Sequence, residues 1–94
     1  MSRTRYLIAY DICNPRRLRR VVKIMEAYGQ RLQYSVFLCD LSQSELLSWR
    51  SEIVPELVQV EDSVVLIDLG PPGFRPVETI GTPRHLPSSG AVIV

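Results

Sequence analysis

The stretch RYLIAYDICNPRRLRRVVKIMEAYG, residues 5–29, decides how the fold begins because it joins two different periodicities. Residues 5–11 are mostly apolar and aromatic, which favours an extended strand. Asn14-Pro15 is typical of a helix start, where a capping side chain precedes a proline at the first helical position. We expect Gly29 to end this helix in a left-handed conformation. An amphipathic helical stripe is formed by Leu18, Val21, Val22, Met25 and Tyr28.

The remainder of the chain alternates in the same way. Residues 30–40 are extended again, with a break near Tyr34-Ser35 that predicts two short strands. The run SQSE at 42–45 matches a capping box and predicts a second helix, which Pro55 should end or kink. A Val- and Ile-rich strand is expected at 63–69, and a further short strand at 77–80. The second helix has its apolar stripe at Leu46, Trp49, Ile53 and Leu57.

This order of elements predicts an α+β fold. Strand, helix, two short strands, helix and strand make the ferredoxin-like split βαβ arrangement, an antiparallel sheet with both helices on one face. The other face stays open and needs a partner, and self-association is the simplest one. We expect residues 1–70 to form the core and residues 71–94 a Pro-rich C-terminal segment. Its apolar end, residues 91–94, should pair with an edge strand of the same chain or of a second protomer.

Composition narrows the class of protein. The chain has 94 residues, of which 46% are hydrophobic, and this fits one globular domain. No apolar run approaches the roughly 18 residues of a membrane helix, and residues 1–5 lack the apolar core of a signal peptide, so we expect a cytoplasmic protein without membrane contact. The net charge is only +1, but basic residues crowd the first third and acidic residues the middle. Such an asymmetry is compatible with one phosphate-binding face.

Asp11 is the main candidate for chemistry. It follows an apolar strand core and precedes the arginine-rich run at 16–20. A carboxylate held at a rigid strand end can bind a divalent metal ion, most readily Mg²⁺, or act as a general base. The alternative is structural, in which Asp11 simply ends the strand or caps the helix.

Strand directions predict which other groups lie near Asp11. We expect the first and third strands to run parallel and the last core strand to run antiparallel to the first. Asp40 and the pair Glu61-Asp62 should then lie at the same sheet end as Asp11, and Asp68 at the opposite end. The same expectation brings Cys13 close to Cys39, with two separate buried thiols as the alternative.

Nucleic-acid contacts are predicted from the cations and aromatic rings. Arg16 and Arg20 share one helix stripe and would contact phosphates, although a charged helix face is more often only solvated. Arg31 on a strand is better placed for such a contact. Tyr10 is a candidate for base stacking, while Phe37 is expected in the core.

The residues named so far resemble a known family. Tyr10-Asp11-Ile12, the arginine-rich helix after it, the stretch YGQRLQYSVF at 28–37 and Glu61-Asp62-Ser63-Val64 are similar to the small CRISPR-associated protein family Cas-two. The stretch at 28–37 is the specific part of the resemblance. The chain departs from the usual family pattern at Leu38, where many relatives have a glutamate.

The resemblance implies a homodimer of ferredoxin-like protomers whose terminal strand segments cross to the partner's sheet. It implies one important carboxylate per protomer at Asp11, near the two-fold axis. It also implies CRISPR adaptation, with binding of the Cas-one integrase, and metal-dependent endonuclease activity on RNA or duplex DNA. Two alternatives are a purely architectural dimer without catalysis and a ferredoxin-like ribonuclease toxin.

Overall fold

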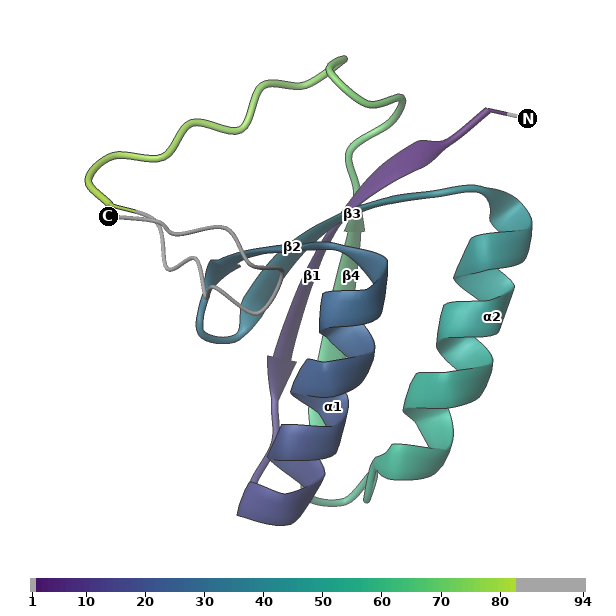
Figure 1. Cartoon of the computed structure of the whole chain (residues 1–94), viewed down its shortest axis with the longest axis vertical. Coiled ribbons are helices and arrows are strands. Elements are labelled where there is room, and N and C mark those ends of the chain that lie inside the picture. The colour runs from purple at the N-terminus through teal and green to yellow at the C-terminus, as the bar shows by residue number, and fades with distance from the viewer. Residues whose placement is uncertain (1, 83–94) are drawn as a thin grey trace.

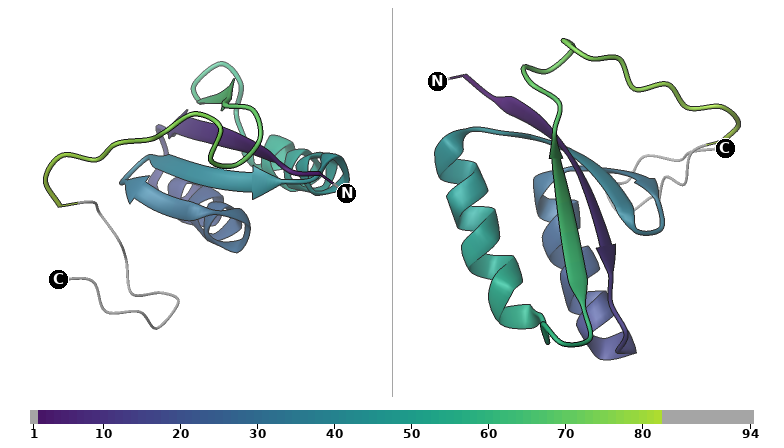
Figure 2. Two further views of the ribbon diagram at one scale, coloured as in Figure 1. Left: turned by 90° about the horizontal axis from the view of Figure 1, so that it is seen from above. Right: turned by 180° about the vertical axis from the view of Figure 1, so that it is seen from behind.

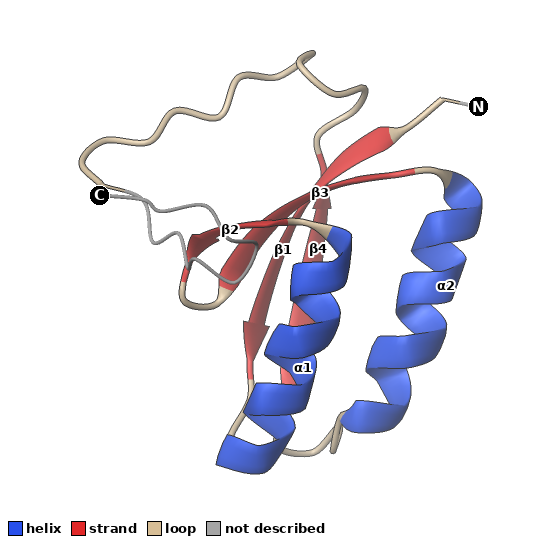
Figure 3. Ribbon diagram, viewed as in Figure 1, coloured by secondary structure: helices blue, strands red, loops and turns tan. Residues whose placement is uncertain are grey.

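The structure is a computed structural model, which describes residues 2–82. The chain forms two helices, α1 (Pro15–Tyr28) and α2 (Gln43–Ile53), and strands lie before and after each of them in the sequence (Figure 1). The strands are β1 (Thr4–Asp11), β2 (Gln30–Gln33), β3 (Val36–Leu41) and β4 (Ser63–Asp68). A short 3₁₀ turn, Val54–Glu56, continues α2 and contains the proline that was expected to end it. The predicted element order is therefore confirmed for the core (Figure 3).

The local signals for the helix starts also act as predicted. The Asn14 side chain accepts hydrogen bonds from the backbone amides of Arg16 and Arg17, and Pro15 is the first helical residue. Ser42 and Glu45 form the reciprocal capping box of α2. Both caps are short-range interactions, which explains why the sequence reveals them.

The four strands form one sheet in the order β2-β3-β1-β4, and every neighbouring pair is antiparallel. The expectation that the first and third strands run parallel is wrong, because Thr4 pairs with Leu41 and Ala9 with Val36. The physical reason is the connectivity. Helix α1 returns the chain so that β2 runs in the direction of β1, and the tight β2–β3 hairpin then reverses β3.

Both helices cover one face of the sheet (Figure 2). The core between helices and sheet contains Ile8, Tyr10, Val21, Met25, Phe37, Cys39, Leu41, Trp49 and Ile53. Strand side chains alternate between faces, so every second residue points away from the helices. We call that second side of the sheet the open face. In β4 it carries Val65 and Ile67, which are 52% and 46% exposed.

Three sequence-based expectations for the fold are wrong in detail. Leu18 is exposed, because the inner stripe of α1 runs through Val21 and Met25. Gly29 has φ −160°, an extended conformation, and it is needed for close approach to β3. Residues 77–80 form no strand in this chain.

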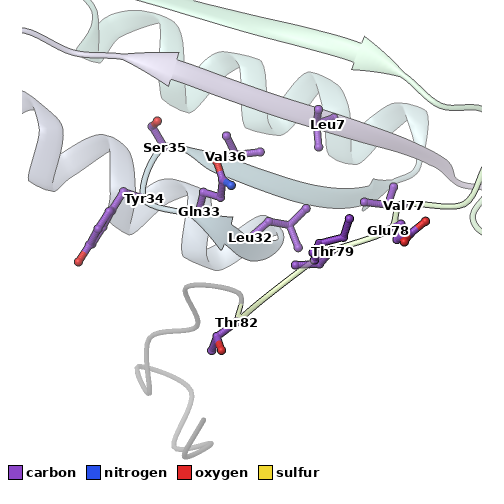
Figure 4. A pocket seen from close by; sticks show the side chains of 11 residues that line it. Leu7, Leu32, Gln33, Tyr34, Ser35, Val36, Val77, Glu78, Thr79 and Thr82 are labelled. Carbon is purple, nitrogen blue, oxygen red and sulfur yellow. The ribbon is translucent and has the colours of Figure 1, made fainter. Parts of the chain in front are cut away.

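Residues 77–82 instead run beside the open face. Residues 77–80 and Thr82, together with Leu7, Leu32 and Val36, line a groove along β1, β2 and β3 (Figure 4). All helices and strands of the described residues lie within 4–68, so the division at residue 70 stays compatible with the fold. The expected pairing of residues 91–94 falls outside the described residues. Within residues 2–82, no helix is both long enough and apolar enough to cross a membrane.

Candidate functional site

Asp11 is the last residue of β1, and its side chain is exposed on the open face. Its neighbours Ile8 and Tyr10 point toward the helices, which fixes the direction of Asp11 by alternation. The cross-strand partner is Ser63, the first residue of β4, whose hydroxyl therefore lies on the same face. Within the described part of the chain, the Asp11 carboxylate has no hydrogen-bond or ion-pair partner. It is thus available to a ligand.

Asp62 lies directly beside this position but is enclosed. Its side chain is 0% exposed and accepts hydrogen bonds from the Cys13 amide at 3.0 Å and the Val58 amide at 2.9 Å. The Arg17 guanidinium adds a bidentate contact, with Nε 2.7 Å from Oδ2 and Nη2 3.2 Å from Oδ1. The hydrogen bonds from Arg17 and then from the Cys13 amide hold the pKa of Asp62 far below its usual range.

Glu61 completes this corner of the molecule. Its carboxylate accepts a hydrogen bond from Arg17 Nη2 at 2.9 Å, and its backbone carbonyl accepts one from the Cys13 thiol at 2.9 Å. The prediction that Glu61 and Asp62 lie at the same sheet end as Asp11 is confirmed. Asp62 nevertheless has no free oxygen for a metal, because each of its two carboxylate oxygens already accepts two hydrogen bonds from the protein.

The strand register also tests the predicted positions of Asp40, Asp68 and Cys39 relative to this site. Asp40 lies at the opposite end of β1, where it pairs with Arg5, so its predicted closeness to Asp11 is wrong. The cause is again the antiparallel direction of β3. Asp68 does lie at the far end, opposite Tyr6, as predicted. Cys39 is buried opposite Tyr6 while Cys13 is exposed beside Glu61, so the expected closeness of the two thiols is also wrong.

The cations of α1 differ in their availability. The Arg16 side chain is exposed and has no ion-pair partner among the described residues. Arg20 is paired with Glu56, with Nε 2.6 Å from Oε1. The first turn of α1 contains no acidic residue. Positive side chains near a helix N-terminus are unfavourable on their own, and an anionic ligand would remove that cost.

Arg31 and Tyr10 form a second group on the helix side of the sheet. The Arg31 guanidinium lies 5.3 Å from the centre of the Phe37 ring and 6.0 Å from that of Tyr34. The Nε atom of Arg31 is buried without a hydrogen-bond partner, and Nη2 is 3.5 Å from the Tyr10 hydroxyl.

Tyr10 is only 5% exposed, and its hydroxyl donates to the Tyr34 carbonyl at 2.8 Å. Burial raises the pKa of this hydroxyl. The Tyr10 ring packs beside Phe37, with 6.2 Å between ring centres. Tyr10 is predicted to stack on a base, but its ring faces the helices and is not exposed for such a contact. Phe37 is in the core, as predicted.

The donor set fits a magnesium ion only in part within one protomer. Among residues 2–82, no cluster of three or more His, Cys, Asp or Glu side chains could hold a metal. Mg²⁺, however, keeps several water ligands and commonly uses one or two carboxylates together with substrate phosphates. The exposed, unpaired oxygens of Asp11 meet that requirement. One protomer would then supply a single carboxylate to such a site.

Leu38 lies on the open face and pairs with Leu7. Four residues of β1 separate that level of the sheet from Asp11, roughly 13 Å at strand spacing. A carboxylate in place of Leu38 would therefore not join Asp11 in the same protomer.

Comparison with known proteins shows which family the chain belongs to. Residues 4–76 match the family model described as "CRISPR associated protein Cas2". The chain belongs to the Cas2 family. "CRISPR-associated endoribonuclease Cas2 3" of Synechocystis sp. is 37% identical over 95% of this chain and 97% of that protein. "CRISPR-associated endonuclease Cas2" of Halalkalibacterium halodurans is 36% identical over 80% of this chain and 83% of its own length.

A solved Cas2 structure supports the same assignment. The crystal structure of Streptococcus pyogenes Cas2 at pH 6.5 matches with a TM-score of 0.73 and 34% sequence identity. The match covers 82% of this chain and 99% of that chain. The ferredoxin-like prediction and the family resemblance are therefore both confirmed.

The sequence did not point to two residues of this candidate site. Arg17 is one of four arginines between residues 16 and 20, yet it makes the closest ion pair of this corner. Ser63 was not singled out, although it is the cross-strand partner of Asp11. The strand register could have revealed Ser63, whereas no local pattern distinguishes Arg17 from its neighbours.

Proposed function

We propose that this Cas2-family protein is a homodimeric CRISPR adaptation protein with metal-dependent endonuclease activity centred on Asp11. The observation that carries the proposal is an exposed carboxylate at the end of a rigid strand, on a face without helices, with no partner among residues 2–82. Relatives named endoribonuclease and endonuclease support hydrolysis of a phosphodiester bond. RNA and duplex DNA are both substrates to test.

The open face supports dimerisation. Val65 and Ile67 are about half exposed there, and burying apolar surface of this kind favours association. A two-fold axis through this face repeats each residue, so each protomer would contribute one Asp11 to a shared site. Such a dimer is the proposed platform for the Cas-one integrase.

The residues of the chain have distinct proposed roles. Asp11 provides the carboxylate oxygens that hold and orient Mg²⁺, and Ser63 lies beside it on the same face. Arg16 and Arg20 bind phosphates, and Glu56 must release Arg20 for that purpose. Arg31 lies farther from the open face and would contact nucleic acid that extends around the β2–β3 hairpin. When bound, Mg²⁺ neutralises charge on the phosphate and lowers the pKa of a water ligand.

The decisive experiment compares wild type with Asp11→Asn on labelled RNA and duplex DNA, with Mg²⁺ or with EDTA. Asp68→Asn is the matched control, since it removes the same charge at the far sheet end. We expect cleavage to fall at least about a hundredfold in Asp11→Asn only. Equal cleavage by all three proteins would show that Asp11 is not catalytic.

An architectural dimer without catalysis is the second candidate, favoured because residues 2–82 contain no cluster of three or more side chains that could hold a metal. The same variants would be tested for spacer integration with the integrase present. Loss of cleavage with integration intact would make the architectural role primary.

A further inference from the structure

The Asp62 carboxylate joins three separate segments of the chain. It accepts hydrogen bonds from Cys13 in the loop after β1 and from Val58 in the loop after α2. It also binds Arg17 in the first turns of α1. The side chain of Asp62 is 0% exposed and that of Arg17 is 15% exposed, so this pair is largely removed from water. Losing Arg17 would leave the enclosed Asp62 carboxylate with only its two backbone donors, the amides of Cys13 and Val58.

These contacts hold the backbone of Asp11 from both sides. Cys13 follows Asp11 by two residues, and its amide is fixed on Asp62 Oδ1 at 3.0 Å. Ser63 follows Asp62 directly and pairs with Asp11 in the sheet. Strand β1 therefore cannot fray at Asp11 without breaking contacts of Asp62. A ligand carboxylate has to be held to within a fraction of an ångström, and its supporting groups provide that precision.

The opposite end of β1 shows a similar ion pair without a neighbouring site. Arg5 contacts Asp40 with Nε 2.7 Å from Oδ1 and Nη2 2.9 Å from Oδ2. The side chains of Arg5 and Asp40 are 24% and 36% exposed, and this pair includes no backbone donor at a strand end. It is a natural internal control for the effect of losing a bidentate Arg–Asp pair.

We infer that Asp62 and Arg17 are positioning residues for Asp11, which they act on through the Cys13 amide and the Ser63 pairing. This inference rests on the proposed function, because it assigns Asp11 as a metal ligand. Supporting groups around a metal ligand typically change metal affinity by about 10- to 100-fold when they are removed. Loss of Asp62 should therefore weaken metal binding at Asp11 even where the fold is kept.

The test titrates Mn²⁺, a paramagnetic substitute for Mg²⁺, into wild type, Asp62→Asn and Asp40→Asn. Broadening of the Asp11 and Ile12 amide resonances by NMR reports binding directly, without an activity assay. We expect half-maximal broadening of Asp62→Asn to need at least about tenfold more Mn²⁺ than wild type. Asp40→Asn should match wild type within about twofold, since Asp40 lies at the other sheet end.

The outcomes separate the inference from the proposed function. Equal Mn²⁺ dependence in wild type and Asp62→Asn would overturn the positioning role alone. If Mn²⁺ does not broaden the Asp11 resonance of wild type, the metal site itself is overturned, and the inference with it. The same holds if Asp11→Asn shows the same broadening as wild type. Arg17→Lys provides the same test if Asp62→Asn loses its folded spectrum. It keeps the charge but not the bidentate contact, and should also require more Mn²⁺.

Discussion

Gly29 shows how one residue can be fixed by packing and not by backbone conformation. Its φ of −160° is open to any residue. A Cβ atom at this position, however, would lie 2.3 Å from Cys39 Sγ and 2.6 Å from the Leu38 carbonyl oxygen. The chain passes from α1 to β2 directly against β3, and only a glycine leaves enough space.

We expect Gly29→Ala to lower the free energy of unfolding by about 1–3 kcal/mol, because β3 must move to admit the methyl group. Urea unfolding followed by circular dichroism measures this. Ala27→Ser, on the exposed surface of α1, is the control and should change stability by less than about 0.5 kcal/mol. A midpoint of Gly29→Ala equal to wild type would contradict the contact.

The two cysteines should differ sharply in reactivity. Cys39 is 0% exposed, and burial raises its pKa to about 12, so it stays a protonated thiol at neutral pH. Cys13 is exposed. Treatment with a thiol reagent at pH 7.5 should modify Cys13 in the folded protein and both residues in urea, as mass spectrometry of peptides will show. Rapid native modification of Cys39 would contradict its burial.

At the scale of elements, the termini of helices and loops are held by named side chains. The capping box of α2 satisfies the Glu45 amide through Ser42 Oγ and the Ser42 amide through the Glu45 carboxylate. Asp62 plays the corresponding part for the loops around β4. Apolar packing sets which face of each helix is buried, but these polar groups set where elements begin.

Ser42→Ala should cost about 0.5–2 kcal/mol of stability, since Ser42 is buried and its hydroxyl caps α2. Ser48→Ala is the matched control on the exposed surface of the same helix and should be neutral or slightly stabilising. Both changes can be measured by urea unfolding at one pH. Equal effects of the two substitutions would argue against capping.

The Asp62 contacts also predict how stability depends on pH. Hydrogen bonds from Arg17 and the Cys13 amide hold the pKa of Asp62 far below its ordinary value of 3.8. The folded state therefore binds this proton more weakly than the unfolded state does. Stabilisation by Asp62 is complete above the unfolded value and is lost as the pH falls below it. Urea unfolding at pH 6, 4 and 3 should show wild type approaching Asp62→Asn; a constant difference would contradict the linkage.

At the scale of the whole molecule, the helices leave the open face of the sheet uncovered. Val65 and Ile67 on β4 are 52% and 46% exposed, and residues 77–80 and Thr82 line a groove beside the other strands. A sheet with one bare apolar face is stabilised when a second copy covers it. The proposed dimer therefore follows from the arrangement of layers and not from any single contact.

Ile67→Asp should convert the proposed dimer to monomer, because a charge would then have to be buried in the interface. Sedimentation velocity measures the mass in solution, and circular dichroism checks that the fold is kept. Leu47→Asp, at a residue 62% exposed on α2, is the control and should stay dimeric. A dimer of Ile67→Asp as stable as wild type would place the interface elsewhere.

Local signals made most of the fold predictable. Asn14-Pro15, the SQSE capping box, Pro55 and the break at Tyr34-Ser35 all act within a few residues, and each is found in the structure. The inner or outer position of Leu18 and the conformation of Gly29 were predicted wrongly. Both depend on how closely α1 approaches β3, which is not encoded in local periodicity.

The sequence by itself determined the element order, the helix caps, the ferredoxin-like class, the family and the strand-end position of Asp11. Only the tertiary structure decided that β3 runs antiparallel to β1, which moved Asp40 and Cys39 away from Asp11. It also showed Arg17 and Asp62 enclosed together and Tyr10 facing the core. The physical reason is range: propensity and capping act between neighbours in the chain, whereas strand direction and ion pairing join residues far apart in sequence.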